Sequence, residues 1–270
     1  MGALDGVKSR FSYVGFVVPT LGKRIDFLKE CLSSLRANRV GFVVLVRPDA
    51  AAWIDVEIQE YVDLIIDDNG SGLAAAINEG IRSLPSNVTY LSWIGDDDYL
   101  APNSILHALQ GFETHKDAVA IFGKCSYIDE SSRKIWENRS GQYATTLMKF
   151  GPFLIPQPGS LIRSEALNSV GLLDEKLQMA FDLDLFLRLN KSGSVKYLNQ
   201  NLASYRWHAS TLTSKNPKLS LRESKIVKLR NGNSATRTLI YLFNRITICV
   251  VYAAKKYIEI KRRTKSRFPN

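Results

Sequence analysis

The chain has 270 residues, 45% of them hydrophobic and 10% aromatic, so it can bury a sizeable core and is not a small disulfide-stapled scaffold. The formal net charge is +10, but residues 215–270 hold 15 Lys and Arg against 2 acids, a net +13 that leaves −3 for residues 1–214. The basic charge therefore belongs to the tail, which lacks the interleaved aromatic and basic residues of nucleic-acid-binding modules.

The first half of the chain alternates expected strands with expected helices. Helical spacing of apolar residues predicts a helix over residues 26–37, and an Ala-rich stretch predicts another that ends near Leu84. This alternation predicts an α/β domain whose largely parallel sheet carries helices on both faces. Short apolar, β-branched runs predict the strands, at residues 13–18, 42–46, 62–66 and 88–94.

The second half has a mixed pattern. Residues 119–122 and the region of Ile135 predict strands, and residues 181–190 predict a helix. Residues 194–206 predict two short strands, and the pattern from Ser234 onward predicts one long helix.

Polar residues stand where the expected strands of the first half end. Ligands of open α/β sheets bind outside the carboxyl ends of the strands, so one crevice is expected to collect these side chains. They are Thr20, Asp49, Asp67 and the three acids Asp96, Asp97 and Asp98.

The acidic turn Gly95-Asp96-Asp97-Asp98 is the strongest chemical signal in the chain. Three adjacent carboxylates repel one another, and holding them at the end of an apolar strand costs stability unless a cation binds there. Oxygen ligands suit Mg²⁺ or Mn²⁺, which complete their coordination with water and substrate phosphates. The alternative is a solvated turn without a ligand.

Three segments, taken together, resemble family 2 glycosyltransferases of the GT-A fold, of the type that builds bacterial surface polysaccharides. The run from Tyr90 to Pro102 is similar to the family's DxD region, in which an apolar strand ends in acids before a proline-started helix. Residues 72–80 resemble its Ala-rich Asn-x-Gly helix, and Val18-Pro19-Thr20 with Arg24 resembles its opening loop. The resemblance covers residues 13–110 in the family's order and implies a Rossmann-like GT-A sheet with flanking helices.

Carried over to the acidic turn, the resemblance implies that Asp96 contacts the ribose of a nucleotide-sugar donor. It further implies that Asp97 ligates Mn²⁺ or Mg²⁺ and that Asp98 supports the metal site from beside it. Gly95 occupies a place where many members carry an acid.

The same resemblance implies a nucleotide pocket formed by the ends of the first three strands. Pro19, Thr20 and Arg24 are expected to line it, with Asp67 or Asp68 near the nucleobase. Members often end the second strand in Asp-Asp-Gly-Ser, whereas this chain has Arg47-Pro48-Asp49, which makes Asp49 the candidate substitute.

Asp182 and Asp184 are candidates for a catalytic base that deprotonates an acceptor hydroxyl. Placed at i and i+2 of a helix start they point different ways, and the apolar pattern does not settle which faces the crevice. Residues 157–188 resemble the family's acceptor half, whose Glu-Asp motif maps to Phe181-Asp182, so the resemblance implies Asp182 as the base. The alternative is that Asp182 only caps its helix.

His208 closes the comparison. Tyr205-Arg206-Trp207-His208, followed by Ser and Thr residues, is similar to the family's Tyr-Arg-x-His stretch. Imidazole is a common metal ligand, so the resemblance implies that His208 ligates the cation from the far side of the turn. The alternative is a structural histidine.

The tail is expected to form a basic helical extension, residues 215–270, after a glycosyltransferase domain at residues 1–214. That domain divides into a nucleotide-sugar half at about 1–110 and an acceptor half at about 111–214. Asn244 and Arg245 interrupt the tail's apolar run, which falls short of the roughly 20 clean residues of a spanning helix. An amphipathic helix with a polybasic end suits an anionic membrane surface, where each Lys or Arg contributes about 1 kcal/mol. A packing helix and an oligomer contact remain open alternatives.

Residues 1–12 contain no apolar run of signal-peptide length. The three widely spaced cysteines, Cys31, Cys125 and Cys249, lie in apolar stretches and predict buried thiols in a reducing compartment. Both observations predict a cytoplasmic protein, peripheral on the inner face of the cell membrane if the tail binds lipid.

The sequence thus predicts an inverting, metal-dependent glycosyltransferase of cell-surface polysaccharide synthesis. It would use a nucleotide-sugar donor, with UDP taken from family frequency, and a saccharide or polyprenol-linked acceptor. Two alternatives remain: a nucleotidyltransferase acting on sugar phosphates, and a non-catalytic module that tethers an assembly to the membrane.

Overall fold

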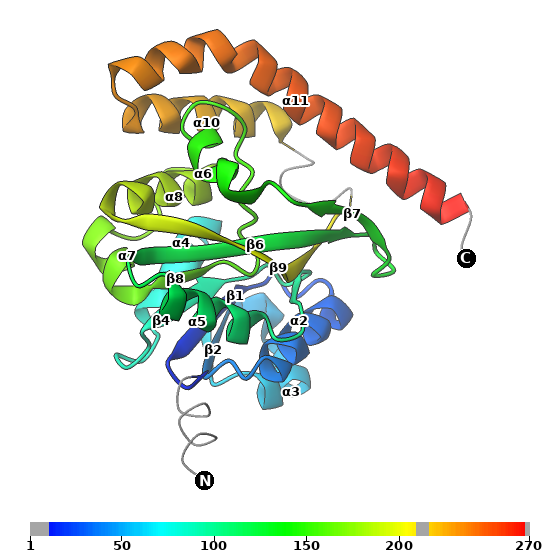
Figure 1. Cartoon of the computed structure of the whole chain (residues 1–270). Helices are drawn as coiled ribbons and strands as arrows, with labels where there is room; N and C mark the ends of the chain where they lie inside the picture. Colours follow the sequence, from blue (N-terminus) through cyan, green and yellow to red (C-terminus); the bar gives the residue numbers. More distant parts are fainter. Residues whose placement is uncertain (1–10, 209–215, 268–270) are drawn as a thin grey trace.

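The computed structural model describes residues 11–208 and 216–267, with side chains up to residue 261. The strands in these ranges form one nine-stranded sheet in the order β3-β2-β1-β4-β8-β6-β9-β5, with β7 paired to β6 (Figure 1). The strands are β1 (Val14–Pro19), β2 (Phe42–Arg47), β3 (Leu64–Asp67), β4 (Tyr90–Trp93), β5 (Tyr99–Leu100), β6 (Ala118–Ile128), β7 (Lys134–Asn138), β8 (Leu161–Arg163) and β9 (Ser194–Arg206). The α-helices are α2 (Ile25–Ala37), α3 (Asp55–Ile58), α4 (Leu73–Arg82), α5 (Ser104–Thr114), α6 (Ala144–Leu147), α7 (Ser164–Val170), α8 (Phe181–Ser192), α10 (Pro217–Asn231) and α11 (Ser234–Arg267).

The first four strands form the parallel half that the alternation predicts. β1 pairs in parallel with β2 and with β4, and β2 pairs in parallel with β3. Helices lie on both sides of the sheet, with α2 and α5 on one side and α8 on the other (Figure 1). Buried side chains of α2 and α5 belong to one core, and those of α4, α7 and α8 belong to the other. The expected α/β fold with helices on both faces is confirmed.

The second half makes the sheet mixed. β8 is antiparallel to both β4 and β6, whereas β6 and β9 run in parallel. The prediction of two short strands within residues 194–206 is wrong, because β9 is a single strand of 13 residues. Register shifts in the β6–β9 pairing accommodate the polar residues in the middle of β9. At Gly123 of β6 the two strands lie so close that an added Cβ would come within 2.6 Å of the Gln200 carbonyl oxygen.

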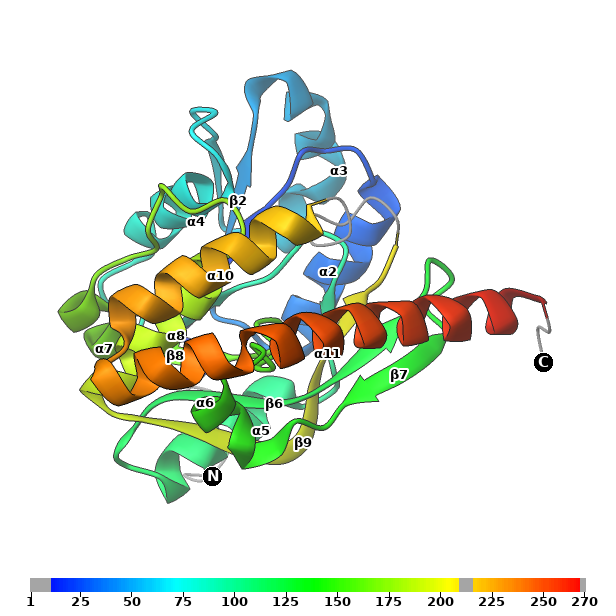
Figure 2. The ribbon, with the colours of Figure 1, turned by 90° about the horizontal axis from the view of Figure 1, so that it is seen from above.

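Two helices end the described chain, although the sequence pattern predicts only the second. α10 packs against α8, and its buried Glu223 accepts the backbone N–H groups of residues 178–180, which lead into α8. α11 runs beside α10 and then continues past the body of the molecule (Figure 2). The division of the chain at 214/215 stays a prediction. The two proposed parts pack closely where α10 meets α8.

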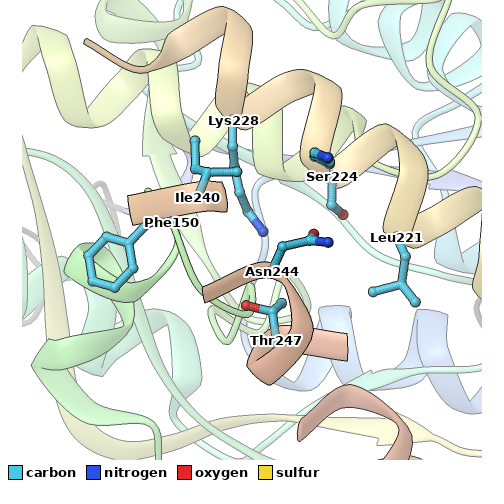
Figure 3. Close-up of a pocket in the computed structure, with 8 residues that line it drawn as sticks. Phe150, Leu221, Ser224, Lys228, Ile240, Asn244 and Thr247 are labelled. Carbon is cyan, nitrogen blue, oxygen red and sulfur yellow. The ribbon is translucent and has the colours of Figure 1, made fainter. Parts of the chain in front are cut away.

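Lys228 of α10 is 4% exposed and points toward α11 beside a cavity of about 20 Å³, space for about one water molecule (Figure 3). Burial lowers the pKa of Lys228 to about 8. Below that pH the lysine is charged in both the folded and the unfolded chain, and only the folded chain carries the desolvation cost.

We therefore expect Lys228→Met to stabilise the fold by up to about 3 kcal/mol at pH 7. The gain should fade as the pH rises from about 8 toward 10.5, where the lysine becomes neutral in both states. Urea unfolding of both proteins at pH 7 and pH 10 measures the difference. An equal or larger gain at pH 10 would show that packing, and not the buried charge, is responsible.

Candidate active site

The carboxyl ends of the parallel strands bring the predicted polar residues to one edge of the sheet. Pro19 at the end of β1 lies opposite Val46, and Arg47 at the end of β2 lies opposite Asp67. The Thr20 N–H donates to the Val46 carbonyl oxygen over 2.9 Å, which extends the ladder by one residue and fixes the loop that follows β1.

The acidic turn is tied directly to that loop. The Thr20 hydroxyl donates to Asp96 Oδ2 over 2.6 Å, and Arg24 Nη2 lies 3.4 Å from Asp96 Oδ1 and 3.0 Å from Asp97 Oδ2. Burial raises the pKa of Asp96, while the hydrogen bond from Thr20 opposes that shift. The structure thus brings together Thr20, Arg24, Asp96 and Asp97, as the sequence predicts.

Asp98 lies on the opposite side of the turn, where it anchors the turn to β9. It is 4% exposed, and its Oδ1 accepts the Arg206 backbone N–H over 2.8 Å. Burial, together with the neighbouring charge of Asp97, raises the pKa of Asp98 well above its usual value. Asp98 therefore holds the turn in place, and its direct part in metal binding stays a prediction.

His208 reaches the turn from the end of β9. Its Nε2 lies 2.7 Å from Asp97 Oδ2 and 2.7 Å from Arg24 Nη1. A neutral imidazole has one proton, so Nε2 either donates to Asp97 or accepts from Arg24, and it can bind a metal only when the proton is on Nδ1. The structure therefore brings His208 to Asp97, and the prediction that both bind a cation stays a prediction.

A divalent cation fits these residues with help from a substrate. Asp97 and His208 offer one carboxylate and one imidazole, and residues 11–208 and 216–261 contain no group of three or more His, Cys, Asp or Glu arranged to hold a metal. Mg²⁺ and Mn²⁺ sites commonly use one or two carboxylates and take further ligands from phosphates and water. The donor set therefore suits a cation that binds together with a diphosphate.

Arg47 organises the region where the nucleobase of the donor is expected. In the sequence this residue is only a departure from the family pattern. Arg47 is 8% exposed; it donates to both carboxylate oxygens of Asp55, over 2.9 and 2.7 Å, and forms an ion pair with Asp67. Asp67 remains largely exposed, and Asp49 is exposed at the start of the short helical turn that follows β2. Asp67 is thus held at the strand edge, whereas Asp49 forms no hydrogen bond or ion pair with Thr20 or Asp96 within the described part of the chain.

The structure separates the two candidate bases on α8. Asp184 is 2% exposed; its carboxylate accepts hydrogen bonds from Arg188 over 2.8 Å, Arg230 over 2.6 Å and Asn231 over 3.0 Å. Asp182 is partly exposed and accepts the Leu183 N–H over 2.7 Å. Within the described residues no cation pairs with Asp182, and burial raises its pKa to about 6. These environments favour Asp182 as the proton acceptor.

Arg206 is a further residue of the site to which the sequence analysis assigns no role. Its side chain is fully buried, donates to the Asp97 carbonyl oxygen over 3.0 Å and forms an ion pair with Glu30. It also donates to the Asp129 carbonyl oxygen over 3.1 Å and to the Ser132 hydroxyl over 3.0 Å. Arg206 therefore joins the acidic turn to α2 and to the loop between β6 and β7.

Residues 16–171, more than half of the chain, match the family described as Glycosyl transferase family 2. The chain belongs to this family. A curated relative is an uncharacterized glycosyltransferase from Rickettsia conorii, 26% identical over 212 residues that make up 73% of this chain and 34% of that protein. The chain spans about a third or less of the length of the curated relatives that it matches.

Two solved glycosyltransferases share the fold. S. aureus TarS residues 1–349 in complex with UDP matches 85% of this chain and 70% of that chain, with a TM-score of 0.61 and 12% identity. The mannosyltransferase PcManGT from Pyrobaculum calidifontis, in complex with GDP-Man and Mn²⁺, matches 96% of this chain and 76% of that chain, with a TM-score of 0.63 and 11% identity. At these identities the likeness concerns the fold alone, and the predicted GT-A fold is confirmed.

Proposed function

We propose that this member of glycosyl transferase family 2 is a metal-dependent, inverting glycosyltransferase that moves a sugar from a nucleotide-sugar donor to an acceptor hydroxyl. The observation that carries the proposal is the network in which Arg24 and His208 meet Asp97 beside the Thr20–Asp96 hydrogen bond. The network lies outside the carboxyl ends of parallel strands, where α/β sheets bind nucleotides.

In this proposal the chain's own residues position the donor and take up one proton. Asp96 accepts a hydroxyl of the ribose, and the guanidinium of Arg24 faces the diphosphate. Asp97 and His208 would hold a divalent cation, which would neutralise the charge on the leaving diphosphate. Asp182 accepts the proton of the acceptor hydroxyl as its oxygen bonds to the anomeric carbon and the bond to the diphosphate breaks. One direct displacement inverts the anomeric carbon.

We infer the substrates from the comparisons and from the charge of the tail. We propose a UDP-sugar as donor; TarS has been solved with UDP and PcManGT with GDP-Man. The acceptor is a saccharide or a polyprenol-linked saccharide of a cell-surface polysaccharide. The net charge of +13 over residues 215–270 fits an enzyme that works at the inner face of the membrane, where such an acceptor is anchored.

A thermal-shift screen of UDP- and GDP-sugars, nucleoside triphosphates and sugar phosphates, each with and without Mn²⁺, tests the proposal. We expect a UDP-sugar to raise the melting temperature only when Mn²⁺ is present, since a ligand at 100 times its Kd stabilises a fold by about 2.7 kcal/mol. An equal shift without metal would contradict the metal dependence. A response to nucleoside triphosphates and sugar phosphates, with none to nucleotide-sugars, would instead indicate a nucleotidyltransferase.

A further inference from the structure

One face of α11, the inner face, packs against the rest of the protein. Ile240, Thr247 and Ile258 are 2%, 7% and 4% exposed, and their spacing places them on one side of a helix with 3.6 residues per turn. Figure 3 shows Ile240 and Thr247 turned toward α10 around Lys228 and Ser224.

Farther along α11, Ile258 packs in a cluster with Ile135 of β7 and with Trp207. Trp207 immediately precedes His208, and its N–H donates to the Ile128 carbonyl oxygen over 2.8 Å. The orientation of α11 is therefore fixed relative to the edge of the sheet that carries the acidic turn.

The outer face of α11 exposes a row of apolar side chains, which we name the outer strip. Its members are between 44% and 67% exposed and recur every three to seven residues, so they share one side of the helix, away from Ile240 and Ile258. Such a continuous exposed apolar row marks an interaction surface. The outer strip consists of Leu242, Ile246, Val250, Tyr257 and Ile260. Phe243 lies at its margin and packs its ring against Phe150, with the ring centroids 5.7 Å apart.

Cations and tyrosines border the outer strip. The 3.6-residue turn places Arg245 and Lys256 along one edge, with the exposed Tyr241 and Tyr252 on the same side. The helix then continues into the sequence Lys-Arg-Arg-Thr-Lys at residues 261–265. An apolar strip with basic and tyrosine borders is the arrangement of helices that lie in the headgroup region of an anionic bilayer.

We propose that the outer strip of α11 docks this enzyme on an anionic lipid surface, with the helix lying in the plane of the membrane. Docking in this way would present the site to a lipid-linked acceptor. The inference rests on the proposed function for this purpose of the docking. Two copies of the strip would bring like charges together, since residues 215–270 carry a net +13, so charge favours the lipid surface over a second copy.

The inner face also decides between lying on the membrane and spanning it. Residues 234–261 are long and apolar enough to cross a bilayer by length and composition. A spanning helix would have to withdraw Ile240 from α10 and Ile258 from Trp207, and it would carry Arg245 into hydrocarbon. The in-plane position keeps every one of these contacts.

Cys249 offers a direct probe, because it is exposed on α11 whereas Cys31 and Cys125 are buried. We label Cys249 with an environment-sensitive maleimide dye and add vesicles of phosphatidylcholine with or without 30% phosphatidylglycerol, a mole fraction set on the order of the anionic content of cell membranes. The expected result is a blue shift with the anionic vesicles only, reversed by about 1 M NaCl. A dye on Val56→Cys in a Cys249→Ser background is the control, since Val56 is exposed on α3.

Variants of the strip complete the test. Leu242→Glu combined with Ile246→Glu is expected to weaken partition onto anionic vesicles at least about tenfold, whereas Val56→Glu is expected to leave it unchanged. Both variants should keep the Mn²⁺-dependent thermal shift with donor, so loss of docking is distinguishable from loss of the proposed function.

Three results would overturn the proposal. One is the absence of a blue shift with anionic vesicles, and another is a dye already shielded in a vesicle-free dimer detected by sedimentation. The third is protein that stays in the vesicles through high salt and alkaline carbonate, which would show a spanning helix.

Discussion

Asp97→Asn is expected to abolish metal-dependent binding of the donor and to lower kcat/KM by at least about 10³-fold. Asp97 Oδ2 is the atom at which Arg24, 3.0 Å away, and His208 Nε2, 2.7 Å away, meet. An amide in its place keeps the shape but loses the negative charge that a divalent cation needs. A loss of about 4 kcal/mol in transition-state stabilisation corresponds to the expected factor.

Titration calorimetry with the donor at several Mn²⁺ concentrations measures this effect apart from turnover. Asp117→Asn is a matched control, because Asp117 precedes β6 at the opposite edge of the sheet and pairs there with Ser194 and Lys196. If Asp97→Asn bound donor with the same Mn²⁺ dependence as the unaltered protein, Asp97 could not be the metal ligand.

The sequence suffices to predict the centre of the site because parallel strands bring their carboxyl ends together. Once residues 13–18 and 88–94 are predicted as strands, Thr20 and Asp96 are expected near each other. In the structure the Thr20 hydroxyl oxygen lies 2.6 Å from Asp96 Oδ2. His208 lies 111 positions beyond Asp97, and only the family resemblance predicts that the two meet.

Arg206 shows what local patterns cannot reveal. Its partners come from α2, from the acidic turn and from the loop at residues 129–132, which are brought together by the long pairing of β6 with β9. That pairing depends on register shifts, and the polar residues of β9 look locally like a turn between two strands. The sequence does contain one indication: Arg206 is a charged residue at an otherwise apolar and aromatic strand end, and a buried charge there requires partners.

The tail shows the opposite case, in which the pattern predicts a helix but not its surroundings. α10 has weak amphipathicity and many charges, so periodicity gives little indication of it, yet Glu223 and Val227 are buried against the body. The prediction of buried thiols is confirmed for Cys31 and Cys125 and is wrong for Cys249, because apolar neighbours in α11 face outward as well as inward.

Asp182→Asn is expected to abolish sugar transfer, by about 10²- to 10⁴-fold, while Mn²⁺-dependent donor binding persists. In the unaltered protein, kcat/KM should fall tenfold per pH unit below about pH 6, because burial raises the pKa of Asp182 to about 6 and only the carboxylate accepts a proton. Asp182→Asn should lose this limb of the pH profile. Loss of donor binding in the variant would mean that Asp182 is misassigned as the base.

The same substitution should stabilise the fold, which a merely structural helix cap would not do. The pKa of Asp182 is higher in the folded chain than its usual 3.8, so folding favours the neutral acid, and the ionised form costs stability above about pH 6. Asp182→Asn should therefore gain about 1–3 kcal/mol at pH 7.5 and nothing at pH 3.5, as melting temperatures at both pH values would show. Asp184→Asn is the matched control: it leaves Arg188 and Arg230 without their shared carboxylate and should lose stability at pH 7.5. Opposite signs at two acids two residues apart would show that α8 uses Asp184 to hold itself in place and keeps Asp182 available for the proton.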